Sequence, residues 1–511
     1  MKIGRRNWET GCAAPVSRLF APAFSSIFEY LFPNRVPLSI EYRHIIDDIL
    51  QKVEMSLTPD QDRAMEQFFR YHRDEIGRAV FVLEGAAGTG KTFLIRLLTY
   101  FLLKQGYKVA LLAPTGRAAK VITKRTKRYA STVHRYIYAP SETPGGGMIF
   151  RLKENKDPSK MYYIVDEASM VGDGGEDGAG SGLLADLLKF VFHDDIKRKI
   201  IMVGDPAQLP PVGSQTSPAL DLDYMRKNYR MRVLGTQMKE VMRQSEFSEV
   251  LRYATEVREA MESDIPPIIE KVWGGEVEYV DNGYEAMELY SGLFRAEDPD
   301  AVVFLTYSNK LAVDVNLAVR KLLHDPEEDL IRGEQIMVVR NNYAWGEQQF
   351  PFIANGEMGF VREVHRETYE EKYGFRWVDV LIEFQDLSNN SVEVECKVVL
   401  DLLADKKAQM SFTDMQQVQR ARREEYQTMP KTRALETMRK DPYINALQIK
   451  YGYAVTGHKA QGGQWRNVII AFEPMYPGMT MHDYLRWAYT AITRAEDKLY
   501  MLGFPFGQKE F

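Results

Sequence analysis

The chain has 511 residues, enough for several structural units, and its apolar and charged fractions are ordinary for a globular protein. A net charge of −5 excludes a globally basic nucleic-acid-binding protein, so any nucleic-acid path must be a local groove. Only Cys12 and Cys396 are present, which excludes a disulfide framework and a cysteine zinc cluster and fits a reducing compartment.

Residues 1–54 are predicted to be an N-terminal extension without a catalytic role. An apolar stretch over 19–32 follows basic residues, as in a signal peptide, but Pro22 and Glu29 interrupt it. It is also shorter than the roughly 20 residues that cross a bilayer. Its helical spacing favours an amphipathic segment, and Met55 could be the start of the functional core. No membrane association is expected.

Short apolar runs, each ended by a turn or a polar residue, predict buried parallel strands. They lie at 79–84, 108–114, 161–166, 199–204, 301–306, 467–472 and 498–503. Helical stretches separate many of them; the one over 93–106 ends at Gly106, as a helix C-cap would. The alternation predicts an α/β fold, and the two groups of strands predict two α/β domains.

The stretch from about 334 to 449 has a different pattern. Strand-like segments at 377–384 and 392–400 are followed by polar, helical sequence over 403–440. This predicts an insertion within the second α/β domain. Earlier in the chain, glycines and acids over 172–182 predict a flexible, solvated loop.

A glycine-rich loop carries the strongest chemical signal, because it follows a predicted strand and opens a predicted helix. Backbone N–H groups of such a loop face a β-phosphate, and the helix N-terminus adds positive potential. Lys91 is predicted to reach the β- and γ-phosphates of ATP, and Thr92 to bind Mg²⁺. The loop comprises Gly85, Ala86, Ala87, Gly88, Thr89, Gly90, Lys91 and Thr92.

Two later strands end in polar residues suited to ATP hydrolysis. Asp166 is placed to hold Mg²⁺ through water, and Glu167 to orient and deprotonate the attacking water. Gln208, in the stiff loop 204–213, is an uncharged donor and acceptor suited to sensing a γ-phosphate. Either feature alone would be an ordinary surface turn; together with the phosphate loop they predict an ATPase site.

Residues 116–135 contain seven Lys or Arg and no acid, a local basic footprint in an acidic chain. A solvated helix face usually mixes both signs. The segment therefore favours contact with a nucleic-acid backbone.

The ordered set of segments resembles the motifs of superfamily 1 helicases, above all the RecD and Dda-like group, over about residues 55–505. They are GAAGTGKT (85–92), APTGRAAK (113–120), DEASM (166–170), GDPAQLPPVG (204–213), MKEVMRQ (238–244), YAVTGHKAQGGQW (453–465) and YTAITRA (489–495). The loop at 172–182 departs from the family pattern. The resemblance implies 5′→3′ movement on single-stranded DNA.

The resemblance also implies roles for residues in this chain. Gln61 would recognise adenine, and Gly462 would lie where its motif couples the DNA grip to the bound nucleotide. Arg243 and Arg494 would reach the γ-phosphate from the second domain. An arginine supplied across a cleft can stabilise transition-state charge. The DNA backbone would be held by Pro114, Thr115, Gly116, Arg117, Thr132, His134, Pro210, Thr456, His458 and Lys459.

The implied fold is two RecA-like P-loop domains with two insertions. Domain 1A would span 55–230, with a β-hairpin pin at about 136–160 whose Phe150 could stack on a base or pack beneath the hairpin. Domain 2A would combine 231–333 and 450–511. An accessory domain 2B over 334–449 would be an SH3-like barrel with a helical extension. Asp379, Glu395 and Lys397 faintly resemble a nuclease site, but alternating strand positions explain them better.

The sequence thus predicts an ATP- and Mg²⁺-dependent 5′→3′ DNA helicase acting on single-stranded DNA and forks. One alternative is a translocase that displaces proteins with little unwinding; another is a nucleotide-gated binding module in which hydrolysis only times release. RNA also fits, because backbone grips discriminate the sugar poorly. A monomer in a bacterial or phage-infected cytoplasm is expected, with a single-strand-binding protein or replication, repair or recombination proteins as partners.

Overall fold

The computed structural model describes residues 40–52, 56–74, 77–142, 148–174, 182–241, 248–263, 269–270, 275–324, 326–342, 344–345, 353–386, 390–504 and 508–509. The chain divides into two compact units, Met1–Met55 and Ser56–Phe511. In the first unit the structure describes one helix, α2 (Ile40–Lys52). Within the described ranges, no helix has the length and apolar character needed to cross a membrane.

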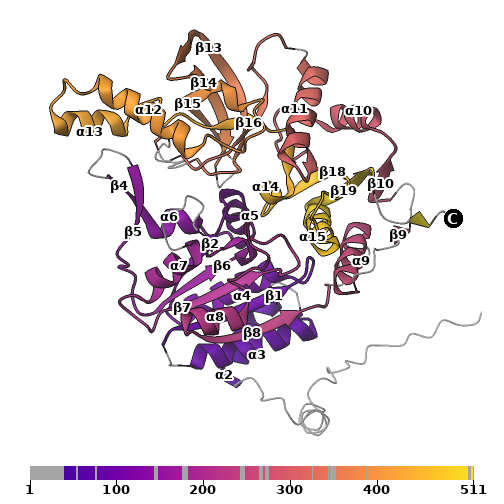
Figure 1. The fold of residues 1–511 in the computed structure, drawn as a ribbon. Coiled ribbons are helices and arrows are strands. Elements are labelled where there is room, and N and C mark those ends of the chain that lie inside the picture. Colours follow the sequence, from indigo (N-terminus) through magenta and orange to yellow (C-terminus); the bar gives the residue numbers. More distant parts are fainter. Residues whose placement is uncertain are drawn as a thin grey trace, which may run out of the picture. The chain divides into compact units, whose positions relative to one another are not determined.

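The second unit begins with a parallel sheet of six strands in the order β3-β2-β6-β7-β1-β8 (Figure 1). The strands are β1 (Ala79–Gly85), β2 (Lys108–Ala113), β3 (Ala130–Thr132), β6 (Met161–Val165), β7 (Lys199–Gly204) and β8 (Arg232–Met238). The predicted α/β class is confirmed. The apolar runs did not reveal β3, which is very short, or β8, an edge strand in which only Val233 and Met238 are buried.

Helices cover both faces of this sheet because alternate residues of a strand point to opposite faces. Phe81 of β1 packs edge-on against Phe68 of α3, with ring centroids 6.0 Å apart. Val80 and Val82 belong to the buried cluster that α7 joins from the other face. The helices are α3 (Pro59–Arg73), α4 (Lys91–Lys104), α5 (Gly116–Thr126), α6 (Val133–Ile137), η2 (Ala168–Met170), α7 (Leu183–Phe192) and α8 (Leu222–Tyr229).

A second parallel sheet has the strand order β10-β19-β18-β11-β17. Helices α9 and α15 bury one face, and α10 and α11 the other. The elements are α9 (Glu249–Ser263), β10 (Val277–Val280), α10 (Gly283–Leu293), β11 (Val302–Thr306), α11 (Asn309–His324), β17 (Ala454–Thr456), α14 (Gly457–Ala460), β18 (Trp465–Ala471), α15 (Met481–Ile492) and β19 (Ala495–Leu502). A short parallel pair joins β9 (Ile269–Glu270) to β20 (Gln508–Lys509).

An antiparallel sheet with the order β15-β14-β13-β12-β16 lies, in sequence, within the second α/β part. Its elements are β12 (Gln335–Val338), β13 (Met358–Lys372), β14 (Phe375–Gln385), β15 (Ser391–Val399), η4 (Leu400–Leu402), α12 (Phe412–Glu425), α13 (Lys431–Arg439) and β16 (Ile449–Tyr451). On this sheet Lys397 forms an ion pair with Asp379 at 3.0 Å, whereas Glu395 is exposed. These residues thus occupy ordinary paired and outward strand positions.

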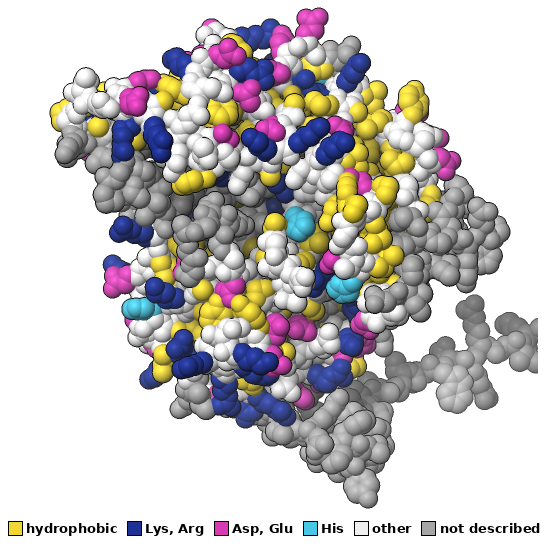
Figure 2. Space-filling model, viewed as in Figure 1, with side chains coloured by type: hydrophobic (Ala, Val, Ile, Leu, Met, Phe, Trp, Pro, Cys, Tyr) yellow, Lys and Arg dark blue, Asp and Glu magenta, His cyan; other side chains and the backbone are white. Residues whose placement is uncertain are grey.

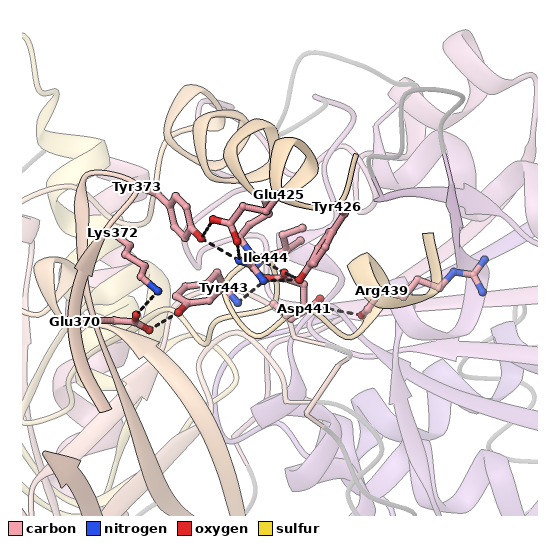
Figure 3. Close-up of polar contacts among 11 residues, drawn as sticks. Glu370, Lys372, Tyr373, Glu425, Tyr426, Arg439, Asp441, Tyr443 and Ile444 are labelled. Carbon is pink, nitrogen blue, oxygen red and sulfur yellow. Dashed lines mark hydrogen bonds and ion pairs between the residues drawn. The ribbon is translucent and has the colours of Figure 1, made fainter. Parts of the chain in front are cut away.

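A polar network fastens the helical part of this region to the antiparallel sheet (Figure 3). Asp441, which is 1% exposed, accepts hydrogen bonds from Arg422 Nε at 2.6 Å and from the backbone N–H of Tyr443 at 2.9 Å. The hydroxyl of Tyr443 in turn donates to Glu370 of β13. The buried carboxylate therefore connects α12 and the segment after α13 to the sheet.

An antiparallel hairpin stands where the pin was predicted. It is formed by β4 (Tyr138–Glu142) and β5 (Met148–Leu152), and Pro140 pairs with Phe150. The side chain of Phe150 and the turn at 143–147 lie outside the described residues, so the proposed base contact stays a prediction. The same holds for residues 175–181 of the predicted glycine-rich loop.

Candidate nucleotide and nucleic-acid sites

The carboxyl ends of three adjacent strands bring the predicted ATPase residues to one edge of the first sheet. In the order β6-β7-β1, the strands are parallel and in register, with Leu83 opposite Val203 and Val165 opposite Met202. The phosphate loop follows β1, Asp166 follows β6, and the loop of Gln208 follows β7. Ligands of open parallel sheets bind at this edge.

The phosphate loop has the backbone that its glycines allow. Gly88 and Gly90 have φ angles of +78° and +85°, which L side chains rarely adopt. Gly90 lies directly before α4, so the first N–H groups of this 14-residue helix open toward the loop. Lys91 donates from Nζ to the carbonyl oxygens of Gly85 and Ala86, at 2.7 and 3.0 Å. Its ammonium therefore lies within the cradle of the loop.

Gln61 is fully buried beside the phosphate loop. Its Oε1 accepts from the backbone N–H of Thr58 in a capping box that starts α3, and its Nε2 donates to the carbonyl of Thr89 at 3.0 Å. Both ends of the amide are thus bonded within the protein. In this arrangement Gln61 supports the loop, and a contact with adenine would replace one of these two bonds.

Asp166 and Glu167 stand at the end of β6, where Glu167 adopts a left-handed backbone conformation with φ of +50°. The backbone N–H of Glu167 donates to Asp166 Oδ1 at 2.9 Å, which fixes the orientation of the Asp166 carboxylate. Burial and the neighbouring Glu167 raise the pKa of Asp166 to about 7. Such strained, desolvated positions are typical of functional sites.

Among the residues that the structure describes, two buried acceptor atoms near this edge have no hydrogen-bond partner. They are Oε2 of Glu167 and Oε1 of Gln208, and the hydroxyl of Ser169 is also unpartnered. An unsatisfied buried acceptor is costly unless a ligand or water completes it. The pair fits a bound nucleotide and an attacking water. The described residues contain no group of three metal-ligating side chains, but Mg²⁺ on a nucleotide takes most of its ligands from phosphate and water.

One of the two predicted γ-phosphate arginines, Arg494, lies within the described residues. Arg494 is buried at the end of α15 and donates to the carbonyls of Thr490 and Gly463, at 3.0 and 3.3 Å, and to the Thr493 hydroxyl. Burial lowers its pKa, and the Glu167 carboxylate opposes that effect, so the two charges interact. Arg243 lies outside the described residues.

Helix α15 also bonds to the loop that carries Gln208, a contact that the sequence did not reveal. Thr490 Oγ1 accepts from the backbone N–H of Leu209 at 2.9 Å, and Arg486 donates to the carbonyls of Pro206 and Gln215, both at 2.7 Å. From the segment after α14, Gln461 donates to the Leu209 carbonyl at 2.7 Å. Polar positions spaced three and four apart in residues 481–493 were the available signal, but that pattern more often marks a solvent face.

The threonines predicted to hold DNA occupy the starts of helices. Thr115 caps α5 by accepting from the N–H of Ala118, and Thr132 caps α6 by accepting from that of Arg135, both at 3.2 Å. Pro114 and Gly116 flank Thr115, and Pro210 is buried in the loop after β7. The ring of His134 packs against Tyr138, and burial lowers the pKa of His134, so a neutral ring is expected near pH 7.

Several basic residues of 116–135 are already paired. Arg117 forms an ion pair with Asp300 and lies over the ring of Trp465, 3.7 Å from its centroid. Lys120 pairs with Glu357, whereas Lys124, Lys127 and Arg128 are exposed. Figure 2 shows Lys and Arg mixed with Asp and Glu on the viewed face rather than one continuous basic surface. The charge open to a nucleic acid here is therefore smaller than the sequence alone indicates.

The second predicted DNA grip follows β17. Thr456 precedes α14, and His458 and Lys459 lie on it. Lys459 borders a small cavity also lined by Thr456 and Lys450; burial and Lys450 lower the pKa of Lys459 to about 7. Burial also lowers the pKa of His458.

Gly462 lies against the start of α5. A Cβ there would come within 2.6 Å of the Ala118 side chain and 3.1 Å of Thr115 Oγ1, and its φ is +73°. Only glycine allows this approach, which brings the segment after α14 into contact with Thr115.

Comparison with known proteins matches two segments of the chain to families. Residues 56–267 match the AAA domain, and residues 451–502 match the UvrD-like helicase C-terminal domain. The two matches contain, respectively, the phosphate loop and the segment from Thr456 through Arg494.

Among curated proteins, the ATP-dependent RecD2 DNA helicase of Deinococcus radiodurans is 24% identical over 470 residues, which are 89% of this chain and 50% of that protein. The ATP-dependent DNA helicase dda of Enterobacteria phage T4 is 34% identical over 90 residues, or 17% of this chain and 20% of that protein. An uncharacterised mimivirus protein is 23% identical over 82% of this chain and 94% of its own. A structure of Pif1 helicases at forked DNA has a TM-score of 0.44 at 18% identity, covering 88% of this chain and 92% of that one.

Proposed function

We propose that this chain, which belongs to the superfamily 1 helicases of the RecD and Dda-like group, is an ATP-dependent 5′→3′ DNA helicase. It would move along single-stranded DNA and separate duplex strands at forks. The residue roles predicted above become part of this proposal, and so do the domain boundaries with one correction. Strand β8 (Arg232–Met238) pairs with β1 in the first sheet, so domain 1A extends at least to residue 238 rather than ending at 230. The two parallel sheets would be the two motor domains 1A and 2A.

The observation that carries the proposal is the meeting of three loops at the carboxyl edge of the first sheet. Lys91 would leave the carbonyls of its own loop and bind the β- and γ-phosphates of ATP. Thr92 and Asp166 would hold Mg²⁺, which neutralises phosphate charge. The unpartnered oxygens of Glu167 and Gln208 would orient the attacking water, and Glu167 would take its proton.

Two arginines of the second motor domain would complete the site on closure. Arg494 is within electrostatic reach of Glu167 but bonds its own helix end, so it would exchange those bonds for the γ-phosphate. Arg243 would act beside it. Because these arginines belong to the other motor domain, hydrolysis would be linked to the opening and closing of the cleft.

Each motor domain would bind the DNA backbone, and a hairpin would separate the strands. Thr115, Thr132 and His134 would hold the backbone on the first domain, and Thr456, His458 and Lys459 on the second. The hairpin β4–β5 would act as the separating pin. The antiparallel sheet with α12 and α13 would be the accessory domain 2B.

The test is ATP-dependent unwinding of two matched partial duplexes, one with a 5′ single-stranded tail and one with a 3′ tail. The expected result is unwinding of the 5′-tailed duplex alone. Preference for the 3′ tail would overturn the polarity. Activity on neither, with DNA-stimulated ATP hydrolysis intact, would instead support a translocase that remodels complexes without separating strands.

A further inference from the structure

A single tyrosine hydroxyl joins the phosphate loop to α15, the helix that Arg494 follows. Tyr489 of α15 accepts a hydrogen bond from the backbone N–H of Ala87 at 2.9 Å. The same hydroxyl donates to Asp205 Oδ2 at 2.6 Å, while Asp205 Oδ1 accepts from the N–H of Ala207. Tyr489 and Asp205 are 1% and 2% exposed, so this bridge is shielded from water.

The bridge connects two parts of the proposed nucleotide site. Ala87 lies in the phosphate loop, and Asp205 opens the loop that carries Gln208. A phosphate oxygen could take over the hydrogen bond that the Ala87 N–H now donates to Tyr489. The same bond would break if the loop changed shape when Lys91 releases the carbonyls of Gly85 and Ala86. Tyr489 is therefore placed to respond to the state of the loop.

The other end of the connection reaches the proposed DNA grip. Two residues before Tyr489 on α15, Trp487 packs against Gly457, where a Cβ would come within 2.7 Å of the indole. Trp487 also donates from Nε1 to the carbonyl of Thr306, whose strand position pairs with Thr456. A shift of α15 would thus displace Trp487 and, through its contact with Gly457, the start of α14, which carries His458 and Lys459.

We propose that Tyr489 is a positioning residue that couples the nucleotide state of the phosphate loop to the grip of the second domain on DNA. Helix α15 is the element that moves, held by Tyr489, Thr490 and Arg486 on the first-sheet side and by Trp487 against Gly457 on its own side. The inference rests on the proposed function and adds to it the route by which ATP changes DNA affinity. Interactions across such a link typically change affinity by about 5- to 150-fold.

The test uses Tyr489→Phe, which removes the hydroxyl and keeps the ring, with Tyr484→Phe as its matched control. Tyr484 is a second buried tyrosine of α15, but its hydroxyl donates at 2.7 Å to the carbonyl of Glu473, in the second-sheet half. For each protein, the dissociation constant of fluorescent oligo-dT is measured with and without a non-hydrolysable ATP analogue. The dissociation constant of the analogue is then measured with and without oligo-dT.

Tyr489→Phe should shrink both ratios toward one by about 5-fold or more, and by the same factor, because coupling is reciprocal. Tyr484→Phe should keep the wild-type ratios even if it lowers the melting temperature more than Tyr489→Phe does. If Tyr489→Phe kept the wild-type affinity ratios, or if both variants lost coupling equally, the role of Tyr489 would be overturned while the proposed function would stand. A wild type that hydrolyses no ATP and shows no nucleotide effect on DNA affinity would overturn the proposed function as well.

Discussion

Lys91 and Gly85 form a hydrogen bond across the phosphate loop, with Nζ 2.7 Å from the carbonyl oxygen. The ammonium is therefore already held where phosphate oxygens would enter, and it needs only to exchange carbonyl acceptors for stronger, charged ones.

Replacing Lys91 with Ala should lower ATP turnover by about 10²- to 10³-fold, the usual cost of losing one donor to a transition state. Stability should change little, because the lost bonds run to carbonyls that water can reach when the side chain is gone. Phosphate release with and without oligo-dT measures the effect. Lys104→Ala, at the other end of α4, is the control and should retain wild-type turnover.

Glu167→Gln should separate ATP binding from hydrolysis. The amide keeps the size of the carboxylate but cannot take the proton of water, so turnover should fall by about 10²- to 10⁴-fold while a fluorescent ATP analogue still binds. Glu154→Gln, an exposed position outside the site, is the control. If Glu167→Gln supported the full effect of the protein on its substrate, hydrolysis would merely time release, and a nucleotide-gated binding module would replace the motor.

The sequence predicted the elements that depend on local patterns. The runs that became β1, β2, β6 and β7 are almost entirely apolar between their ends because both faces of those strands are covered. The family resemblance, which rested on segments in both halves of the chain, is confirmed by the matches to 56–267 and 451–502.

Contacts between distant segments could not be predicted in the same way. Tyr489 and Ala87 are 402 positions apart, and nothing local to either residue indicates the other. The basic segment 116–135 is another instance, because Asp300 and Glu357 neutralise Arg117 and Lys120 from far along the chain. Local charge is visible in a sequence, whereas its pairing depends on the tertiary structure.

The affinity for single-stranded DNA should depend on pH through Lys459. Burial and Lys450 lower its pKa to about 7, and the groups around it are Lys450, Tyr451, Asn309 and Asn316. A DNA phosphate favours the charged lysine, so binding should take up a proton. Affinity should then fall by up to about tenfold per pH unit above pH 7.

Oligo-dT titrations from pH 6 to 9 measure this dependence, and Lys459→Arg should flatten it because arginine stays charged. Lys127→Arg, an exposed lysine, should leave it unchanged. The stability of the protein without DNA should depend on pH in the opposite direction. The lysine of the unfolded chain keeps its proton to about pH 10, so the free energy of unfolding should increase as the pH rises from about 7 to about 10. An affinity that is constant over this range would contradict the assignment of Lys459 as a phosphate contact.

Asp441→Asn should destabilise the antiparallel sheet and its helices. Arg422 would lose its buried counter-charge, and breaking one partner of such a pair typically costs about 3–5 kcal/mol. Hydrogen exchange should accelerate in α12 and α13 more than in the first parallel sheet. Asp414→Asn, at a half-buried residue of the capping box that starts α12, should have a much smaller effect. Equal protection in the two variants would show that the network does not fasten these helices.

Removing the tip of the hairpin should separate unwinding from ATP turnover. Strands β4 and β5 pair only with each other within the described residues, so a Gly-Ser turn in place of 141–149 leaves both large sheets intact. Unwinding of a 5′-tailed fork should fall at least about tenfold, because no rigid element then stands between the strands, while DNA-stimulated ATP hydrolysis should persist. The matched control replaces 387–389, between β14 and β15, with Gly-Ser and should unwind normally. Equal unwinding by both variants would mean that strand separation uses a different element, and an equal loss of ATP hydrolysis would mean that the hairpin helps to hold the motor together.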